Sequence, residues 1–305
     1  MIKNIKEYLV KLKEELGGSD PALIQDALSD AEEHLQNALD EAIESSPKIS
    51  ESEALKSLIE KYGTPAEIAS AYREIESRIQ PTLAPIKPTK KLSLGAKFFS
   101  AAGESRTWGA LLYILISGLT AFVYGTWALL GGTFSFLSLI LIIGIPVTGL
   151  FLLSLRGIAL VEGRIIEALL GIRMPRKPVF LHRALNWRQK YKALITEAHT
   201  WKIFAYLILH FILGIAYFLI IFILLSLSIK LALYPLWFWT LGRPLITINQ
   251  PFYPAAWSYP LVVAAGILLL YSTFHLIRFI GRFHGRLAKS MLVRKQEQIH
   301  KRGSS

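Results

Sequence analysis

Residues Ala110–Leu130 read ALLYILISGLTAFVYGTWALL, a run without a single Asp, Glu, Lys, Arg or His. At about 1.5 Å of rise per residue, a helix of about twenty residues crosses the roughly 30 Å hydrocarbon core of a bilayer. A backbone in lipid must satisfy its own hydrogen bonds, which favours a helix over an irregular segment. This stretch therefore predicts a membrane-spanning helix, and it decides the fold class of the chain around it.

Three more segments share this apolar character, so four spans are predicted: Trp108–Leu130, Phe136–Leu155, Trp201–Leu227 and Tyr259–Ile280. They lie in residues 81–305, the part of the chain that contains most of its hydrophobic residues. Four helices that are apolar all round, in the core of a soluble protein, are a much less favoured alternative. The absence of cysteine excludes disulfides, thiolate metal sites and cysteine nucleophiles.

From Trp108 onward, the sequence contains the same pattern twice. Thr107-Trp108-x4-Tyr113-x10-Tyr124 recurs 93 residues later, and two basic exits, Arg156-x6-Gly163-Arg164 and Arg278-x6-Gly285-Arg286, recur at an offset of 122. We interpret residues 108–171 and 201–293 as two copies of a two-helix hairpin. About thirty-three residues are inserted after Pro235 in the second copy, and insertions in repeats are frequent places of function.

The insertion begins with Leu231–Leu241, which is apolar but too short to span and is predicted to be interfacial or re-entrant. The segment Lys230–Ser258 is rich in aromatic residues. Two readings stay open for it, a belt at the lipid headgroups or a ligand-facing surface. The candidate ligand or sensing residues are Trp237, Trp239, Phe252, Tyr253 and Trp257, together with His210 in the third span.

Lysine and arginine predict the direction of the spans. Residues 1–80 have a net charge of −8, whereas residues 81–305 have a net charge of +20. The basic residues gather before the first span, between the second and third, and after the fourth. The positive-inside rule then puts both termini in the cytoplasm of a multi-pass protein in the cell membrane. Both hairpins would enter from the same side, as parallel repeats.

Residues 1–80 predict a small, acidic, cytoplasmic bundle of four helices. Apolar residues at spacings of three and four mark a helix that stops near Gly17, and Asp20-Pro21 starts the second. Ser50-x-x-Glu53 and Thr64-Pro65-Ala66-Glu67 are capping boxes that open two more. A proline- and lysine-rich linker follows at 81–107. The bundle should either stand off an anionic bilayer or dock onto the basic inner loops.

No motif for catalysis, nucleotide binding or metal-dependent hydrolysis occurs, and we expect no signal peptide before the bundle. We predict no enzyme, no catalytic residue, no cofactor and no direct contact with nucleic acid, and a homo-oligomer is compatible with the sequence. Asp30 and His34 could share a metal only if further ligands joined, and a solvated polar face explains them equally. His210 is interpreted either as a hydrogen-bonded interhelical group or as a proton-linked switch.

The basic exits are predicted to be amphipathic helices on the inner membrane surface, acting as anchors or as switch elements. The candidate anchors are Arg156, Arg164, Arg278, Arg282 and Arg286. Residues 296–305 form a basic tail.

Two resemblances add to this interpretation. Asp30-Ala-Glu-Glu-His34-Leu, with Leu58-Ile-Glu-Lys-Tyr-Gly-Thr-Pro-Ala-Glu-Ile-Ala69, resembles the HAAS signalling domain over residues 1–78. The doubled hairpin, with Ile143-Gly-Ile-Pro146 and Arg164-Ile-Ile-Glu-Ala-Leu-Leu-Gly171, is similar to the sensor domain of prokaryotic membrane signalling proteins over about 105–295. That sensor domain is often joined to a histidine kinase, and we expect no ATP-binding domain before Ser305.

Two functions follow as hypotheses. The first is a non-catalytic sensor that relays a membrane or extracytoplasmic cue through its bundle to a cytoplasmic partner, which the resemblance implies is a transcription regulator. The candidate partner-binding residues are Glu32, Glu33, His34 and Glu67. The alternative is a transporter or lipid-handling protein with a site between the two repeats. A purely structural scaffold in the bilayer is a third reading.

Overall fold

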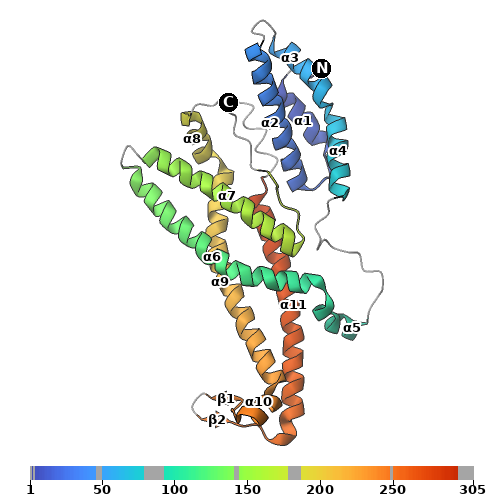
Figure 1. Ribbon diagram of the computed structural model, residues 1–305, viewed down its shortest axis with the longest axis vertical. Coiled ribbons are helices and arrows are strands. Elements are labelled where there is room, and N and C mark those ends of the chain that lie inside the picture. The colour runs from blue at the N-terminus through green and yellow to red at the C-terminus, as the bar shows by residue number, and fades with distance from the viewer. Residues whose placement is uncertain are drawn as a thin grey trace. The chain divides into compact units, whose positions relative to one another are not determined.

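The computed structural model describes residues 2, 4–45, 50–78, 93–140, 144–177, 187–247 and 250–294. The described chain is almost entirely helical and divides into two compact units (Figure 1). Unit 1 comprises residues 1–84, 126–208 and 286–305, and unit 2 comprises residues 85–125 and 209–285. Three long helices continue from one unit into the other.

The predicted acidic bundle in unit 1 is confirmed as four helices: α1 (Ile5–Glu15), α2 (Pro21–Ser45), α3 (Glu51–Tyr62) and α4 (Pro65–Arg78). The apolar positions that recur every three or four residues meet in one core, in which Tyr8, Leu12, Leu35 and Leu55 are fully buried. At about 25 cal/mol per Å² of apolar surface removed from water, such burial is the main stabilising contribution to a domain of this size.

Both predicted capping boxes form. Glu53 N–H donates to the Ser50 hydroxyl at 3.3 Å, and Thr64 N–H donates to the Glu67 carboxylate at 2.8 Å. Gly63 separates α3 from α4 at a φ of 111°, a backbone conformation that residues with a Cβ rarely adopt. The Tyr8 hydroxyl donates to the Gly63 carbonyl at 2.8 Å, so α1 holds this turn in place.

Four of the described helices are long and apolar enough to cross a membrane: α6 (Ser105–Ser138), α7 (Gly144–Leu170), α9 (Ala198–Ala232) and α11 (Tyr259–Leu292). Three predicted spans lie inside α6, α9 and α11. The predicted start of the second span at Phe136 is wrong, because α6 continues past its predicted end to Ser138 and α7 begins at Gly144. The exits at Arg164 and Arg286 are not separate amphipathic helices, because α7 and α11 run through them unbroken. No proline interrupts either exit, so nothing in the sequence forces a break there.

Large apolar side chains on these helices face outward. Leu119 and Leu150 are each 69% exposed, and Phe222 is 59% exposed. Soluble monomers rarely leave apolar patches of this extent in contact with water, whereas lipid tails cover them without cost. The exposed surface thus agrees with four candidate membrane spans.

In unit 2 the first half of α6 crosses α9 at glycines. A Cβ at Gly118 would come within 2.8 Å of the Phe218 ring, and one at Gly125 would come within 2.4 Å of the Phe211 ring. Residues later in α6 therefore meet residues earlier in α9, which is the contact pattern of helices that pack with opposite chain directions. Small residues at such a crossing let two backbones approach closely in a membrane protein.

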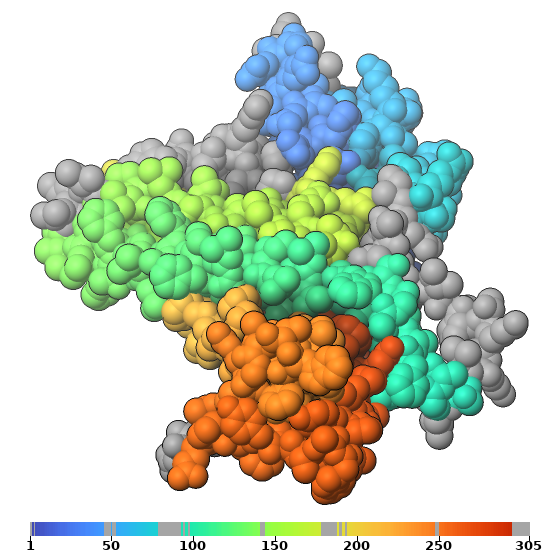
Figure 2. All heavy atoms as spheres, turned by 60° about the horizontal axis from the view of Figure 1, so that its bottom comes forward, coloured from blue at the N-terminus to red at the C-terminus, as the bar shows by residue number. Residues whose placement is uncertain are grey.

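Shorter elements complete the chain: α5 (Leu94–Phe99) and η1 (Ser100–Gly103) precede α6, and α8 (Trp187–Thr196) precedes α9. The inserted segment of unit 2 folds into α10 (Tyr234–Leu241), the paired strands β1 (Ile246–Thr247) and β2 (Pro251–Phe252), and η2 (Ala256–Ser258). The strands are antiparallel, with Ile246 opposite Phe252. In Figure 2, where the bottom of Figure 1 comes forward, the inserted segment belongs to the orange surface.

Candidate functional site

The candidate site lies in unit 1, where a short basic connector follows α7. Gly171 ends the helix at a φ of 66°, which turns the chain out of the helical path. Residues 171–177, the connector, then run without helix or strand. Arg173 and Met174 on this connector are buried, although arginine rarely is unless it is paired.

Arg173 is paired twice with the acidic bundle. Its Nη2 donates to Asp26 Oδ2 of α2 at 2.8 Å, and its Nε donates to Glu76 Oε1 of α4 at 2.8 Å. The Arg173 side chain is 8% exposed and that of Asp26 is 7% exposed. One guanidinium therefore holds two helices of the bundle against the connector.

Asp26 also receives two backbone hydrogen bonds. Its Oδ1 accepts from the N–H of Arg176 at 2.7 Å and from the N–H of Lys177 at 3.0 Å. A buried carboxylate with an arginine and two amide donors has its charge compensated, which is the condition for burying it at an acceptable cost. We name this set the docking contact: Asp26, Asp30 and Glu76 of the bundle with Arg173, Arg176 and Lys177 of the connector.

Asp30 forms the more exposed edge of the docking contact. It accepts hydrogen bonds from Tyr72 and from the Lys177 ammonium. Desolvation raises the pKa of Asp30, but the hydrogen bonds and charge of Lys177 and the hydrogen bond of Tyr72 outweigh it, so the pKa of this carboxyl is lowered overall. The docking contact should consequently weaken in acid.

A pH titration checks this expectation. A group with a lowered pKa contributes stability above its unfolded pKa and loses it as the pH falls through its folded pKa. With spin labels on cysteines at Glu33 and Ala168, the docked fraction should be constant from pH 7 to about 5 and fall below pH 4. Asp30→Asn should lower the docked fraction at pH 7 and make its decrease below pH 4 smaller. Asp40→Asn should leave both the docked fraction and its decrease unchanged. If the docked fraction of Asp30→Asn decreased with pH as it does in the native chain, the assignment of this acid sensitivity to Asp30 would be refuted.

The bundle has a second attachment, to the end of α11. The Lys289 ammonium pairs with Asp20 at the start of α2, and Arg294 N–H donates to the Gln25 side chain at 2.8 Å. The start of α2 thus contacts the exits of both α7 and α11 within unit 1. These contacts confirm that the bundle docks onto basic segments, one of the two alternatives drawn from the sequence, and the position of these segments on the inner side stays a prediction.

A buried ion group lies beside this attachment. Arg156 of α7 donates to Glu197 Oε2 at 2.6 Å and to the Thr200 hydroxyl at 2.8 Å, and Arg294 approaches the same carboxylate at 3.1 Å. All three ion-pair side chains are at most 12% exposed. Also in unit 1, the Tyr206 hydroxyl donates to the fully buried Glu162 at 3.4 Å.

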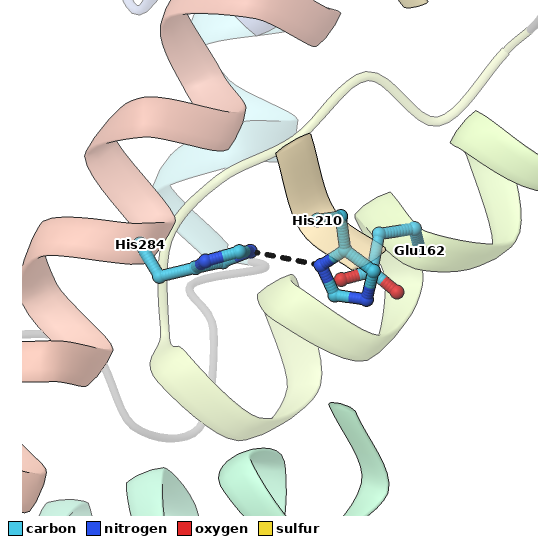
Figure 3. A group of neighbouring side chains, drawn as sticks. All are labelled: Glu162, His210 and His284. Atoms are coloured by element: carbon cyan, nitrogen blue, oxygen red, sulfur yellow. Dashed lines mark hydrogen bonds between the residues drawn. The ribbon is translucent and has the colours of Figure 1, made fainter. Parts of the chain in front are cut away.

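His210 lies fully buried in unit 2, inside the third span. Its Nδ1 is 3.3 Å from Nε2 of His284 on α11, as Figure 3 shows by a dashed line, and its Nε2 is 3.3 Å from the Thr120 hydroxyl on α6. Tyr113 and Tyr217 surround His284 with ring centroids at 5.4 and 5.8 Å. The interpretation of His210 as an interhelical hydrogen-bonding group is confirmed, and a proton-linked switch stays a prediction.

The candidate sensing residues of unit 2 are mostly exposed. Trp239 and Trp257 are 88% and 77% exposed, and Trp237, Phe252 and Tyr253 are exposed to a smaller degree. The ring of Phe238 packs against those of Tyr253 and Tyr259, with ring centroids 6.0 Å apart in each pair. Phe238 thus connects α10 to the later part of the segment. This arrangement is compatible with both a belt at the lipid headgroups and a ligand-facing surface.

The candidate partner-binding residues lie on the bundle. Glu33 and His34 are exposed on α2, and Glu32 is half-buried. The His34 ring stacks on Tyr62 with centroids 4.6 Å apart, while Asp30 turns to Tyr72 and Lys177. Glu67 is exposed but is occupied as the cap of α4, where two hydrogen bonds from Thr64 lower the pKa of Glu67.

The candidate anchors fall into two groups. Arg156 is buried in the ion group, and Arg278 pairs with Glu104 at 2.8 Å in unit 2. Arg164, Arg282 and Arg286 are more exposed, and Arg164 pairs with Glu167 at 3.1 Å. Contact of any of them with lipid headgroups stays a prediction.

Sequence reasoning missed Asp26, Glu76, Arg173 and Glu197 as individual site residues. For Asp26 the sequence contained a signal, the helical spacing of Ala22, Asp26 and Ser29. These three residues form a second buried face of α2 beside the apolar stripe that faces the bundle core. A carboxylate within such a face points to a cationic partner, which the opposite charges of the two halves would supply.

Comparison with known families agrees with both resemblances. A family model described as "Putative sensor" matches residues 113–292, and the HAAS family model matches residues 7–71. The described docking contact joins these two matched regions, since Asp26 lies in the second and Arg173 in the first. No curated protein and no solved structure gives a significant match to the chain.

Proposed function

The chain belongs to the sensor family and carries a HAAS domain, and on that premise we propose that it is a non-catalytic membrane signal transducer. Its membrane helices receive a membrane or extracytoplasmic cue, and its acidic bundle relays that cue to a cytoplasmic regulatory protein. The observation that carries the proposal is the docking contact, in which a buried arginine just after α7 holds the bundle through Asp26 and Glu76.

The mechanism follows from the two attachments of the bundle. Arg173 follows α7 by three residues, and Lys289 lies in the last turn of α11. A shift of one helix exit relative to the other cannot preserve both attachments, so it favours release of the bundle. A cue acts by binding one of the two arrangements more tightly than the other. A difference of about 1.4 kcal/mol would change the docked-to-released ratio tenfold.

Two copies of one hairpin are part of the proposal, and reciprocal ion pairs support them. Glu104 and Glu197 stand at the 93-residue offset, and Arg156 and Arg278 stand at the 122-residue offset. Arg156 pairs with Glu197 in unit 1, and Arg278 pairs with Glu104 in unit 2. Each exit arginine thus contacts the glutamate before the other copy's first span, as a pseudo-two-fold relation requires.

A second pair of contacts has the same relation. Tyr113 and Tyr206 stand at the first offset, and Glu162 and His284 stand at the second. Tyr206 contacts Glu162 in unit 1, and Tyr113 contacts His284 in unit 2. The charge distribution supports cytoplasmic termini and entry of both hairpins from that side.

Gene replacement tests the proposed function. Deleting residues 1–80 from the chromosomal copy should change a defined set of transcripts while the membrane part still accumulates in the membrane. A chain with Arg173→Gln should change the same set, because its bundle is released. Arg282→Gln serves as the control, because it removes an exposed charge from α11 whose hydrogen bond goes to the Arg278 carbonyl of the same helix. An unaltered transcript profile in the deletion strain would refute signal transduction.

A further inference from the structure

A pocket opens in unit 1 beside the docking contact. It has an empty volume of about 410 Å³, its open mouth included, and is lined by parts of the bundle, the connector, α7, α9 and the end of α11. Its polar lining consists of Gln25, Arg156, Lys177 and His199, and Leu160 and Ile203 are among its apolar walls.

Two buried side chains in the pocket retain hydrogen-bonding capacity. Arg156 is 8% exposed, and its Nε and Nη1 have no acceptor within hydrogen-bond distance in the described part of the chain. His199 is 4% exposed, and its Nδ1 also has no hydrogen-bond partner in the described part of the chain. Buried polar groups are nearly always hydrogen-bonded, so a site lined by two such groups points to an additional partner.

The charge of the surroundings identifies the sign of that partner. Arg156 and Arg294 both contact the carboxylate of Glu197. The charges that act on the neighbouring His199 come from three cations, Arg156, Arg294 and Lys202, and from this carboxylate, so the surroundings are positive. Lys177 at the rim is also a cation, but it is paired with Asp30 and therefore adds no net charge to the pocket. Electrostatic interactions are strong where water is excluded, so the pocket favours an anion over a neutral ligand.

We propose that this pocket binds a phosphate-type anion, with Arg156 as the principal donor and His199 as a second ligand. An arginine with two free N–H groups suits phosphate oxygens, which accept charge-assisted hydrogen bonds. The apolar walls Leu160 and Ile203 lie beside the anion and accommodate a less polar part of the ligand. The same chemistry is offered by a free phosphate and by the phosphodiester headgroup of an anionic lipid.

The pocket also connects binding to docking, a step that rests on the proposed function. Gln25 belongs to the bundle and accepts from Arg294 N–H, and Lys177 belongs to the docking contact. A ligand that contacts the docked arrangement stabilises it over the released one by mass action. The anion is therefore expected to raise the docked fraction of the chain.

Binding is measured on the purified full-length chain in a neutral detergent. Inorganic phosphate is titrated against chloride at equal ionic strength, and in parallel phosphatidylglycerol is titrated against phosphatidylcholine in mixed micelles. The midpoint of thermal unfolding should rise with phosphate, with phosphatidylglycerol or with both. A rise with phosphate identifies the free anion as sufficient, and a rise with the lipid alone identifies the headgroup as the source.

Three variants make the assignment specific. Arg156→Gln should weaken anion binding at least about tenfold, the effect of losing a charge-assisted hydrogen bond. Arg278→Gln is the matched control, because it removes the equivalent exit arginine, which pairs with Glu104 outside the pocket, and it should bind as the native chain does. Ala159→Leu fills the pocket without changing a charge and should also abolish binding, so it replaces Arg156→Gln if that variant does not fold.

The proposal is overturned if neither probe moves the midpoint, or if Arg278→Gln loses as much binding as Arg156→Gln. Equal binding in Ala159→Leu would overturn it as well. Docking is read separately from the spin-label distance between Glu33→Cys and Ala168→Cys. Binding without a change in that distance would overturn only the link to docking, and a distance that is insensitive to Arg173→Gln would count against the proposed function instead.

Discussion

Glu197→Gln is expected to lower the unfolding midpoint of the chain far more than a comparable surface change. The carboxylate of Glu197 is shared by Arg156 and Arg294, and all three side chains are nearly excluded from water. Removing one member of a buried ion group leaves uncompensated buried charge, which costs about 3–5 kcal/mol. Thermal or denaturant unfolding of the purified chain in detergent measures this loss.

The matched control is Glu104→Gln, at the corresponding position before the first span. Glu104 pairs with Arg278, but the two side chains are 40% and 21% exposed, so water screens the pair. Exposed pairs contribute about 0–1 kcal/mol, and the midpoint should move several times less than in Glu197→Gln. Equal shifts in the two variants would show that burial of the Glu197 group is not what stabilises the chain.

Arg173→Gln should release the bundle, the second large effect. This guanidinium makes two ion pairs with the bundle, and its loss leaves Asp26 buried with only two backbone donors. The expected cost to docking is again about 3–5 kcal/mol. The spin-label distance between α2 and α7 should broaden to longer values, and α2 should become accessible to protease at the face that contains Asp26.

A double-mutant cycle separates the direct pair from indirect damage. If Arg173 and Asp26 act on each other, Arg173→Gln with Asp26→Asn should cost clearly less than the sum of the two single changes, because the second change removes the stranded charge. Asp40→Asn in place of Asp26→Asn is the control, and its effect should add to that of Arg173→Gln. Full additivity for Asp26 would contradict the assigned pair.

The bundle was the most predictable part of the fold, because its signals are local. The Ser50 and Thr64 caps, Gly63 and the apolar stripes each act within a few residues, and α1–α4 begin and end near the positions that these signals indicate. The four spans were equally accessible, since length and apolar composition suffice. The extension of α6 to Ser138 was less accessible, because Gly131-Gly132 directly after Leu130 indicates a helix end, whereas α6 continues through both glycines.

The site was less predictable because its partners are distant in the sequence. Asp26 and Arg173 are 147 residues apart, and Asp26 becomes buried only when the connector covers its face of α2. The opposite charges of the two halves indicated docking onto basic segments without indicating which carboxylate meets which arginine. Glu197 gave no local signal either, since an acid beside Ala198-His199 is compatible with a solvated loop.

Locking the docked arrangement tests signal transduction most directly. The chain has no cysteine, so Asp30→Cys with Lys177→Cys introduces two thiols at side chains that contact each other, and a short cleavable bis-maleimide can join them. The cross-linked chain should fail to give the transcript changes that accompany bundle release, and cleavage of the linker should restore them. A cross-linked chain that still produces those changes would contradict release of the bundle as the signal.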